Sequence, residues 1–175
     1  MNTINNKKRR SSKEKIERAF VTLLQEKEIE KIYVTDIIKL AKVNRSTFYA
    51  NYLDIYDLAD KISDNMINEV KKIYKDENEN NYNSNDFLKL FKHIYDNKLF
   101  YNTLFKLKVD EKIGKYLYDT NLSKELYNDE YIDYHIIFFK AGLNAIIKKW
   151  LSNDCIESPE EINKILITEY QKNIN

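Results

Sequence analysis

The feature that most constrains this chain is its near absence of glycine and proline. Only Gly114, Gly142 and Pro159 occur in 175 residues. A sheet-rich protein of this length would need many tight turns, and such turns draw on glycine and proline. The absence of a glycine-rich loop also excludes phosphate-binding loops and dinucleotide-binding folds. The sequence therefore predicts an all-α protein.

Helical periodicity divides the chain at a polar segment. Ser11 and Glu14 match a capping box that opens a first helix ending near Lys27, preceded by a mobile arm over residues 1–10. Thr35, Asn44 and Asp54 are expected to cap three further helices: 36–42, 45–52 and a long fourth helix. Residues 75–85 lack apolar periodicity and predict a loop. Five more helices are predicted over 86–97, 98–107, 111–127, 130–153 and 159–173, the last capped by Ser158 before Pro159.

Charge is distributed unevenly along the chain. The formal net charge is only +1, but residues 1–50 hold 12 basic and 6 acidic side chains, whereas residues 51–175 hold 17 basic and 22 acidic ones. A basic surplus confined to one end is typical of a region that binds polyanions. We therefore expect residues 1–54 to form a nucleic-acid-binding domain and residues 55–175 a second, helical domain.

Three helices within about 45 residues, the second and third joined by a tight turn at 42–44, match helix-turn-helix spacing. In such a domain the third helix enters the major groove of DNA. Arg45 can bind a guanine edge or a phosphate there, and the hydroxyls of Ser46 and Thr47 can reach either. An ordinary three-helix cluster, with Tyr49 and Tyr52 as core residues, is the competing interpretation of the same spacing.

Residues 34–52, VTDIIKLAKVNRSTFYANY, resemble the DNA-binding signature of TetR/AcrR-type transcriptional regulators, and the resemblance extends over residues 11–70. It implies a helix-turn-helix domain joined by the long fourth helix to a C-terminal effector-binding and dimerisation domain. It further implies that Phe48 and Tyr52 anchor the recognition helix. The DNA-contacting residues implied by the resemblance are Thr35, Arg45, Ser46, Thr47, Tyr49 and Asn51.

Two departures from that signature bear on DNA binding. Lys42 stands where the family has a turn glycine, so the left-handed conformation would be strained or avoided there. Ile55 replaces a phosphate-binding lysine, so that contact is expected to be lost or moved to Tyr56. These departures leave open an alternative function, a helical interaction module with a degraded DNA-binding end. The run Lys7–Arg10 is either a solvated tail or an arm that enters a minor groove.

The segment 131–151 is apolar around most of a helix. Four consecutive apolar residues, Ile136 to Phe139, exceed what the core of one chain can cover, so the remainder needs a partner surface. Ala141, Gly142 and Ala145 are small enough for close helix approach. This segment and the last helix resemble the paired helices by which TetR-type proteins dimerise. The expected interface residues are Ile136, Phe139, Leu143, Ile146, Ile147, Trp150, Ile162 and Leu166.

Aromatic side chains are concentrated between the polar segment and this predicted bundle. The resemblance implies an effector pocket in this region, and aromatic walls suit a small apolar or aromatic molecule. Ordinary core packing is the competing interpretation for each of them. The residues are Phe87, Phe91, Tyr95, Phe100, Tyr101, Phe105, Tyr116, Tyr118, Tyr127, Tyr131 and Tyr134.

Other classes of function lack the residues they need. Cys155 is the sole cysteine, and His93 and His135 are the only histidines, so we expect no metal site, no cofactor and no convergent catalytic set. No apolar run approaches the length of about 20 residues that spans a bilayer. The sequence thus predicts a cytoplasmic, non-enzymatic homodimer that binds a palindromic double-stranded operator, a small effector and no membrane.

Overall fold

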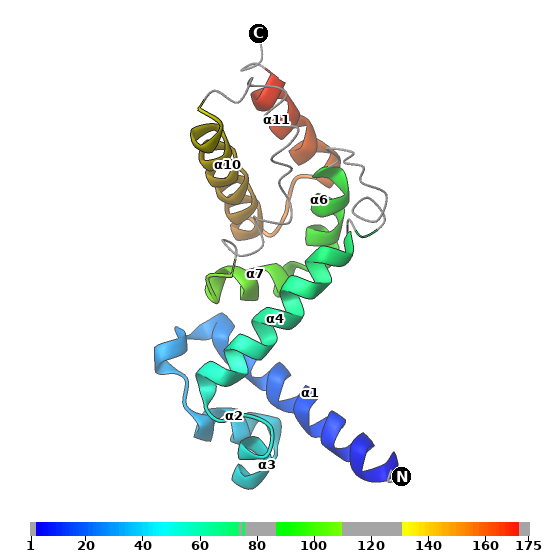
Figure 1. Cartoon of the computed structure of the whole chain (residues 1–175), viewed down its shortest axis with the longest axis vertical. Coiled ribbons are helices and arrows are strands. Elements are labelled where there is room, and N and C mark those ends of the chain that lie inside the picture. Colours follow the sequence, from blue (N-terminus) through cyan, green and yellow to red (C-terminus); the bar gives the residue numbers. More distant parts are fainter. Residues whose placement is uncertain (1–2, 74, 76–86, 110–130, 172–175) are drawn as a thin grey trace. The chain divides into compact units, whose positions relative to one another are not determined.

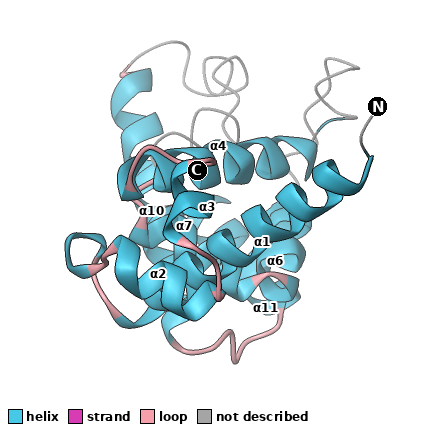
Figure 2. Cartoon of the chain, turned by 90° about the horizontal axis from the view of Figure 1, so that it is seen from below, coloured by secondary structure: helices cyan, strands magenta, loops and turns pink. Residues whose placement is uncertain are grey.

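The structure, a computed structural model, describes residues 3–73, 75, 87–109 and 131–171. Every regular element in these ranges is a helix, which confirms the all-α prediction (Figure 1). Figure 2 shows these helices joined by loops, with no strand in the described part of the chain. The chain divides into two compact units, residues 1–66 and 67–175.

The first unit is built from three helices and the start of a fourth. It contains α1 (Thr3–Glu26), the short 3-10 turn η1 (Ile29–Lys31), α2 (Val34–Ala41), α3 (Arg45–Tyr49) and the first turns of α4 (Ile55–Ile73). Helix α2 packs against both α1 and α3 (Figure 1). The core of this unit consists of apolar side chains from all four helices, including Ile16, Phe20, Leu24, Ile37, Ala41, Phe48, Leu58 and Ile62.

Helix α1 begins at Thr3, so the predicted arm over residues 1–10 and the predicted start at Ser11 are wrong. The carboxylate that would complete the capping box is engaged elsewhere. Glu14 accepts a 3.2 Å hydrogen bond from Nε of Arg10, four residues earlier on the same helix. Because residues i and i+4 are neighbours on a helix surface, this pair stabilises a continuous helix and not a new N-terminus.

Helix α4 carries the predicted apolar stripe. Leu58, Ile62, Met66 and Val70 are buried along it. The Asp54 carboxylate caps the helix as expected, accepting a 2.8 Å hydrogen bond from the backbone N–H of Asp57. The first three turns of α4 belong to the first compact unit, and the division between the two units lies inside this helix, between residues 66 and 67.

The second unit contains α6 (Phe87–Asp96), α7 (Lys98–Lys106), α10 (Ile132–Ser152) and α11 (Pro159–Gln171). Helix α6 packs against α11 and α7, and α7 packs against α10. Trp150 is almost fully buried, stands edge-on to Phe91 with ring centroids 5.9 Å apart, and donates a 2.9 Å hydrogen bond from its indole N–H to the Glu157 carbonyl.

The start of α11 follows the sequence prediction closely. Ser158 Oγ accepts a 3.3 Å hydrogen bond from the Glu161 N–H, and the Glu161 carboxylate accepts a 2.8 Å hydrogen bond from the Ser158 N–H. This reciprocal pair is a capping box, and Pro159 occupies the first helical position. The predicted helix over 111–127 and most of the predicted loop over 75–85 lie outside the described residues.

Candidate nucleic-acid interface

The turn between α2 and α3 sets the direction of the recognition helix. Lys42, the residue after α2, adopts the left-handed conformation with φ 54° and ψ 47°. The N–H of Val43 then donates a 3.1 Å hydrogen bond to the Ile38 carbonyl, which closes the end of α2. Lysine therefore does not avoid the glycine conformation; it adopts it at a strain of about 1–2 kcal/mol.

Helix α3 has one buried residue and an exposed surface. Phe48 is fully buried, and its ring stands edge-on to that of Tyr49 at 5.4 Å and lies 5.7 Å from that of Tyr52. Arg45, Ser46 and Tyr49 are exposed, and Thr47 is half-buried. The buried ring holds this short helix on the core, so the exposed residues face away from it.

Arg45 and Tyr49 are joined one turn apart on the exposed surface of α3. The Arg45 guanidinium donates a 3.4 Å hydrogen bond to the Tyr49 hydroxyl and lies 5.6 Å from the centroid of that ring. An arginine held over an aromatic ring loses fewer rotamers on binding a ligand than a free one. The pair thus presents a planar cation and a hydroxyl side by side.

The other two residues expected to contact phosphate have different surroundings. Helix α2 begins at Val34, so Thr35 lies in its first turn and does not cap it; Asp36 instead accepts the Tyr33 N–H at 3.5 Å. Asn51 has both ends of its amide engaged within the protein. Its Nδ2 donates to the Thr47 carbonyl at 2.7 Å, and its Oδ1 accepts Nε of Arg9 at 3.5 Å.

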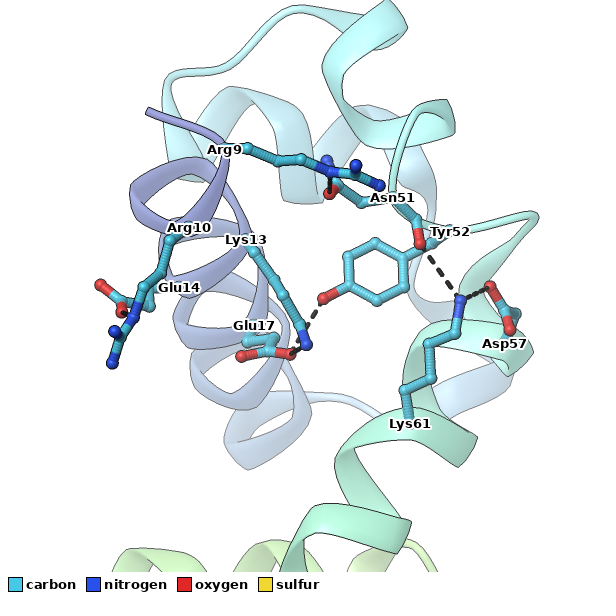
Figure 3. Close-up of polar contacts among 9 residues, drawn as sticks. All are labelled: Arg9, Arg10, Lys13, Glu14, Glu17, Asn51, Tyr52, Asp57 and Lys61. Atoms are coloured by element: carbon cyan, nitrogen blue, oxygen red, sulfur yellow. Dashed lines mark hydrogen bonds and ion pairs between the residues drawn. The ribbon is translucent and has the colours of Figure 1, made fainter. Parts of the chain in front are cut away.

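Tyr52 lies between α1 and α4 and is buried by both. Its hydroxyl donates a 2.9 Å hydrogen bond to Glu17, and burial together with that carboxylate raises the tyrosine pKa above its ordinary value (Figure 3). Lys61 lies 5.2 Å from the centroid of the Tyr52 ring. Lys61 also donates a 2.8 Å hydrogen bond to Asp57, and this bond lowers the pKa of the Asp57 carboxyl.

These groups surround an open cleft of 360 Å³ on the first unit, which we call the α1–α4 cleft. Its lining residues are Arg9, Arg10, Lys13, Asn51, Tyr52 and Lys61. Lys13 and Lys61 do not stand out in the sequence as site residues, because each lies in an ordinary helical segment. The sequence does indicate that Arg9 and Lys13 share a helix face with Ile16 and Phe20, because these positions are three or four residues apart.

The residues expected at a dimer interface lie mostly in the core of the second unit. Ile136 and Ile146 are half-buried, whereas six others are already buried within one chain. These six are therefore covered by packing within one chain, and their place at an interface stays a prediction. The six buried residues are Phe139, Leu143, Ile147, Trp150, Ile162 and Leu166.

The predicted aromatic region is divided between core and surface. Phe91 and Tyr101 are buried, and the rings of Phe87 and Phe139 lie 5.4 Å apart. Tyr131 and Tyr134 are exposed, and Tyr116, Tyr118 and Tyr127 lie outside the described residues. His93 faces the Tyr101 hydroxyl at 2.8 Å from its Nδ1.

In the described ranges no group of three or more His, Cys, Asp or Glu side chains could hold a metal ion. None of the described helices combines the length and apolar character needed to cross a membrane.

Comparison with known proteins supports the reading of both units. No curated protein sequence matches this chain. The solved structure of a protein described as the dihydroxyacetone kinase operon activator DhaS matches with a TM-score of 0.52 at 20% identity, covering 93% of this chain and 96% of that one, which shows a shared fold. A TetR-type family model described as a transcriptional regulator C-terminal region matches residues 82–169, half of the chain. With a helix-turn-helix in its first unit and this match in its second, the chain belongs to the TetR family of transcriptional regulators.

Proposed function

We propose that the protein is a homodimeric, ligand-responsive repressor that binds a palindromic double-stranded operator through α3. The observation that carries this proposal is the arrangement of α3 itself: Phe48 is buried against the core, while Arg45, Ser46 and Tyr49 are exposed on the same short helix. A helix held in this way can enter a major groove without losing its packing.

The exposed side chains suit DNA in kind as well as in position. Arg45 can bind the O6 and N7 atoms of a guanine with two parallel hydrogen bonds, and Ser46 can reach a base edge or a phosphate. Tyr49 can donate to a backbone phosphate while its hydroxyl oxygen accepts the hydrogen bond from Arg45. The left-handed turn at Lys42 keeps the helix-turn-helix geometry intact, which counts against a degraded DNA-binding end.

Dimerisation is supported by an exposed apolar face on α10. Phe138 is 74% exposed and Ile137 64% exposed, and Tyr134 lies one turn earlier. Ala141, Gly142 and Ala145 are exposed beside them. A Cβ added at Gly142 would meet nothing within 4 Å, so the packing of one chain gives no reason for glycine inside this helix. A second copy packing closely against these small residues provides one.

The proposed effector is a small apolar or aromatic molecule bound by the second unit. Phe87 of α6 packs against Phe139 of α10, and Phe100 packs against Tyr101 within α7. Aromatic side chains of this kind suit the walls of a pocket for such a molecule. An effector that binds one arrangement of the dimer more tightly than the other would shift the separation of the two recognition helices, and with it the operator affinity.

The test is binding of the purified full chain to DNA upstream of its own gene and to palindromes selected from random sequence, followed by fluorescence anisotropy. We expect salt-sensitive, sequence-specific binding that Arg45→Ala weakens by about 1–3 kcal/mol while relaxing base preference at one position of each half-site. Absence of specific binding in the unaltered protein would overturn the proposed function and favour an interaction module.

Repression is tested separately, with a reporter transcribed from the bound promoter. The structural neighbour is described as an activator, so the sign of regulation needs its own measurement. We expect reporter output to rise when the gene is deleted. Output should stay at this raised level when the deletion strain produces Arg45→Ala in place of the natural chain. A fall in output on deletion would identify an activator instead.

A further inference from the structure

The α1–α4 cleft lies beside the recognition helix but contains none of its base-reading residues. Figure 3 shows Arg9 and Lys13 of α1 pointing toward Asn51 and Tyr52, with Lys61 of α4 beyond the ring, while Arg10 points toward Glu14 on the other side of α1. Four of the six lining residues are cationic, and the Tyr52 ring forms an uncharged wall. A concave surface lined by cations concentrates positive potential and attracts an anion.

Three of the four cations are paired with carboxylates. The ion pairs are Arg10 with Glu14 at 3.2 Å, Lys13 with Glu17 at 3.7 Å and Lys61 with Asp57 at 2.8 Å. Arg9 makes no ion pair within the part of the chain that the structure describes. Its guanidinium therefore contributes a positive charge that no nearby carboxylate balances, and its terminal nitrogens are available to a ligand.

Asn51 connects Arg9 to the recognition helix. Its amide N–H is held by the Thr47 carbonyl at 2.7 Å, and its amide oxygen accepts the Arg9 Nε at 3.5 Å. Because the hydrogen bond to Thr47 fixes the amide nitrogen, the amide oxygen of Asn51 also points in a fixed direction. Asn51 therefore acts as a positioning residue that directs the guanidinium of Arg9 toward the side of the cleft nearest α3.

Lys61 supplies a cation from the opposite side of the cleft. Its ammonium lies over the Tyr52 ring and donates to the Asn51 carbonyl at 3.2 Å. Ile55, at the start of the same helix, has no charge to offer a phosphate. Lys61, about two turns further along α4 than Ile55, thus places a positive charge near the end of α3.

We propose that the α1–α4 cleft binds one backbone phosphate of the operator in each half-site, with Arg9 as its direct ligand, Asn51 as the residue that positions Arg9, and Lys61 as the opposing cation. This inference rests on the proposed function, since it adds a contact to the same DNA. The ligand is a phosphodiester, so the contact strengthens binding to every sequence and carries no base preference.

The test compares Arg9→Ala with Arg18→Ala, an equal loss of charge at an exposed position further along α1 and outside the cleft. Affinity of the full chain is measured for the selected operator and for unrelated DNA across a salt series. Arg9→Ala should lower the slope of log K against log salt by about 1 per protomer, or about 2 for a dimer. The loss of DNA affinity caused by Arg9→Ala, relative to the unaltered protein, should then shrink about tenfold between 50 and 200 mM salt, and equally for both DNAs.

Each outcome separates the two proposals. If the unaltered protein binds its operator but Arg9→Ala has the same slope as Arg18→Ala, the cleft does not bind phosphate, although the DNA-binding function stands. A loss confined to the operator would assign Arg9 to base reading and would also overturn the inference. If the unaltered protein does not bind DNA specifically, the proposed function fails first.

The positioning role of Asn51 is tested by a double-mutant cycle. Asn51→Ala should weaken DNA binding in the natural background and have no further effect in the Arg9→Ala background, with the salt slope unchanged by the second substitution. Thermal unfolding of each variant reports any loss of the Thr47 hydrogen bond separately. Equal losses in both backgrounds would mean that Asn51 contacts the DNA itself, and the positioning role would be rejected.

Discussion

The hydroxyl of Tyr52 donates a 2.9 Å hydrogen bond to the carboxylate of Glu17, thirty-five residues earlier in the chain. This bond joins α1 to the segment that follows the recognition helix α3, which ends at Tyr49. Burial and the carboxylate together raise the pKa of Tyr52, which favours the protonated hydroxyl that donates this bond. The position of α3 relative to α1 therefore depends on a polar contact as well as on Phe48.

Tyr52→Phe is expected to destabilise the protein by about 1–2 kcal/mol, because it removes a hydrogen bond to a charged acceptor while Glu17 stays accessible to water. The measurement is urea unfolding followed by circular dichroism. Tyr56→Phe, at an exposed tyrosine of α4, is the matched control and should change stability by less than about 0.5 kcal/mol. Equal effects of the two substitutions would show that the Tyr52 hydroxyl contributes nothing.

Lys42→Gly is expected to stabilise the protein by about 1 kcal/mol, because glycine adopts the left-handed conformation without strain. The control is the same substitution at Lys39, which lies within α2 and should lose about 1 kcal/mol. Both values come from thermal unfolding of the full chain. A destabilised Lys42→Gly variant would argue that the lysine conformation carries no strain.

Phe138→Glu is expected to weaken self-association at least about tenfold, because it places a charge in the face proposed to meet a second copy. Analytical ultracentrifugation over a concentration series measures the effect. Ile156→Glu, at a residue 82% exposed in the turn after α10, is the control and should leave the dimer intact. A dimer unaffected by Phe138→Glu would have to use another surface.

His93 is expected to make the stability of the protein depend on pH. Desolvation lowers the pKa of His93, and this outweighs the attraction of Asp96 and Glu69. As the solution is acidified, the unfolded chain, whose imidazole is ordinary, binds more protons than the folded chain. The free energy of unfolding therefore decreases as the pH is lowered through the ordinary imidazole range. We expect His93→Gln to flatten the profile of unfolding free energy between about pH 8 and pH 5. Parallel profiles for the two proteins would contradict this assignment.

Local signals in the sequence were reliable where the residues that determine the outcome lie within one turn of each other. Ser158 and Pro159 predicted the start of α11, and the structure adds Glu161, which completes a capping box with Ser158 within one turn. The same motif at Ser11 and Glu14 gave a wrong start for α1. There the carboxylate had a second possible partner, Arg10, and the choice between the two was not local to the motif.

Periodicity predicted the long apolar helix of α10 but not the use of each face. Leu143 and Phe138 are equally apolar in the sequence, yet the first is buried and the second exposed. The difference depends on where α6, α7 and α11 pack, and those helices are distant in sequence. The α1–α4 cleft was missed for the same reason, because Arg9 and Lys61 come together only when α1 and α4 fold around Tyr52.

The sequence by itself determined the helical class and the helix-turn-helix signature, because glycine and proline content, caps and helical spacing act over a few residues. Tertiary structure decided which apolar face is core, which cations share a cleft, and that Asn51 binds Arg9 instead of standing free. These outcomes depend on contacts between residues far apart in the chain, and no local pattern records which distant partner a side chain will meet.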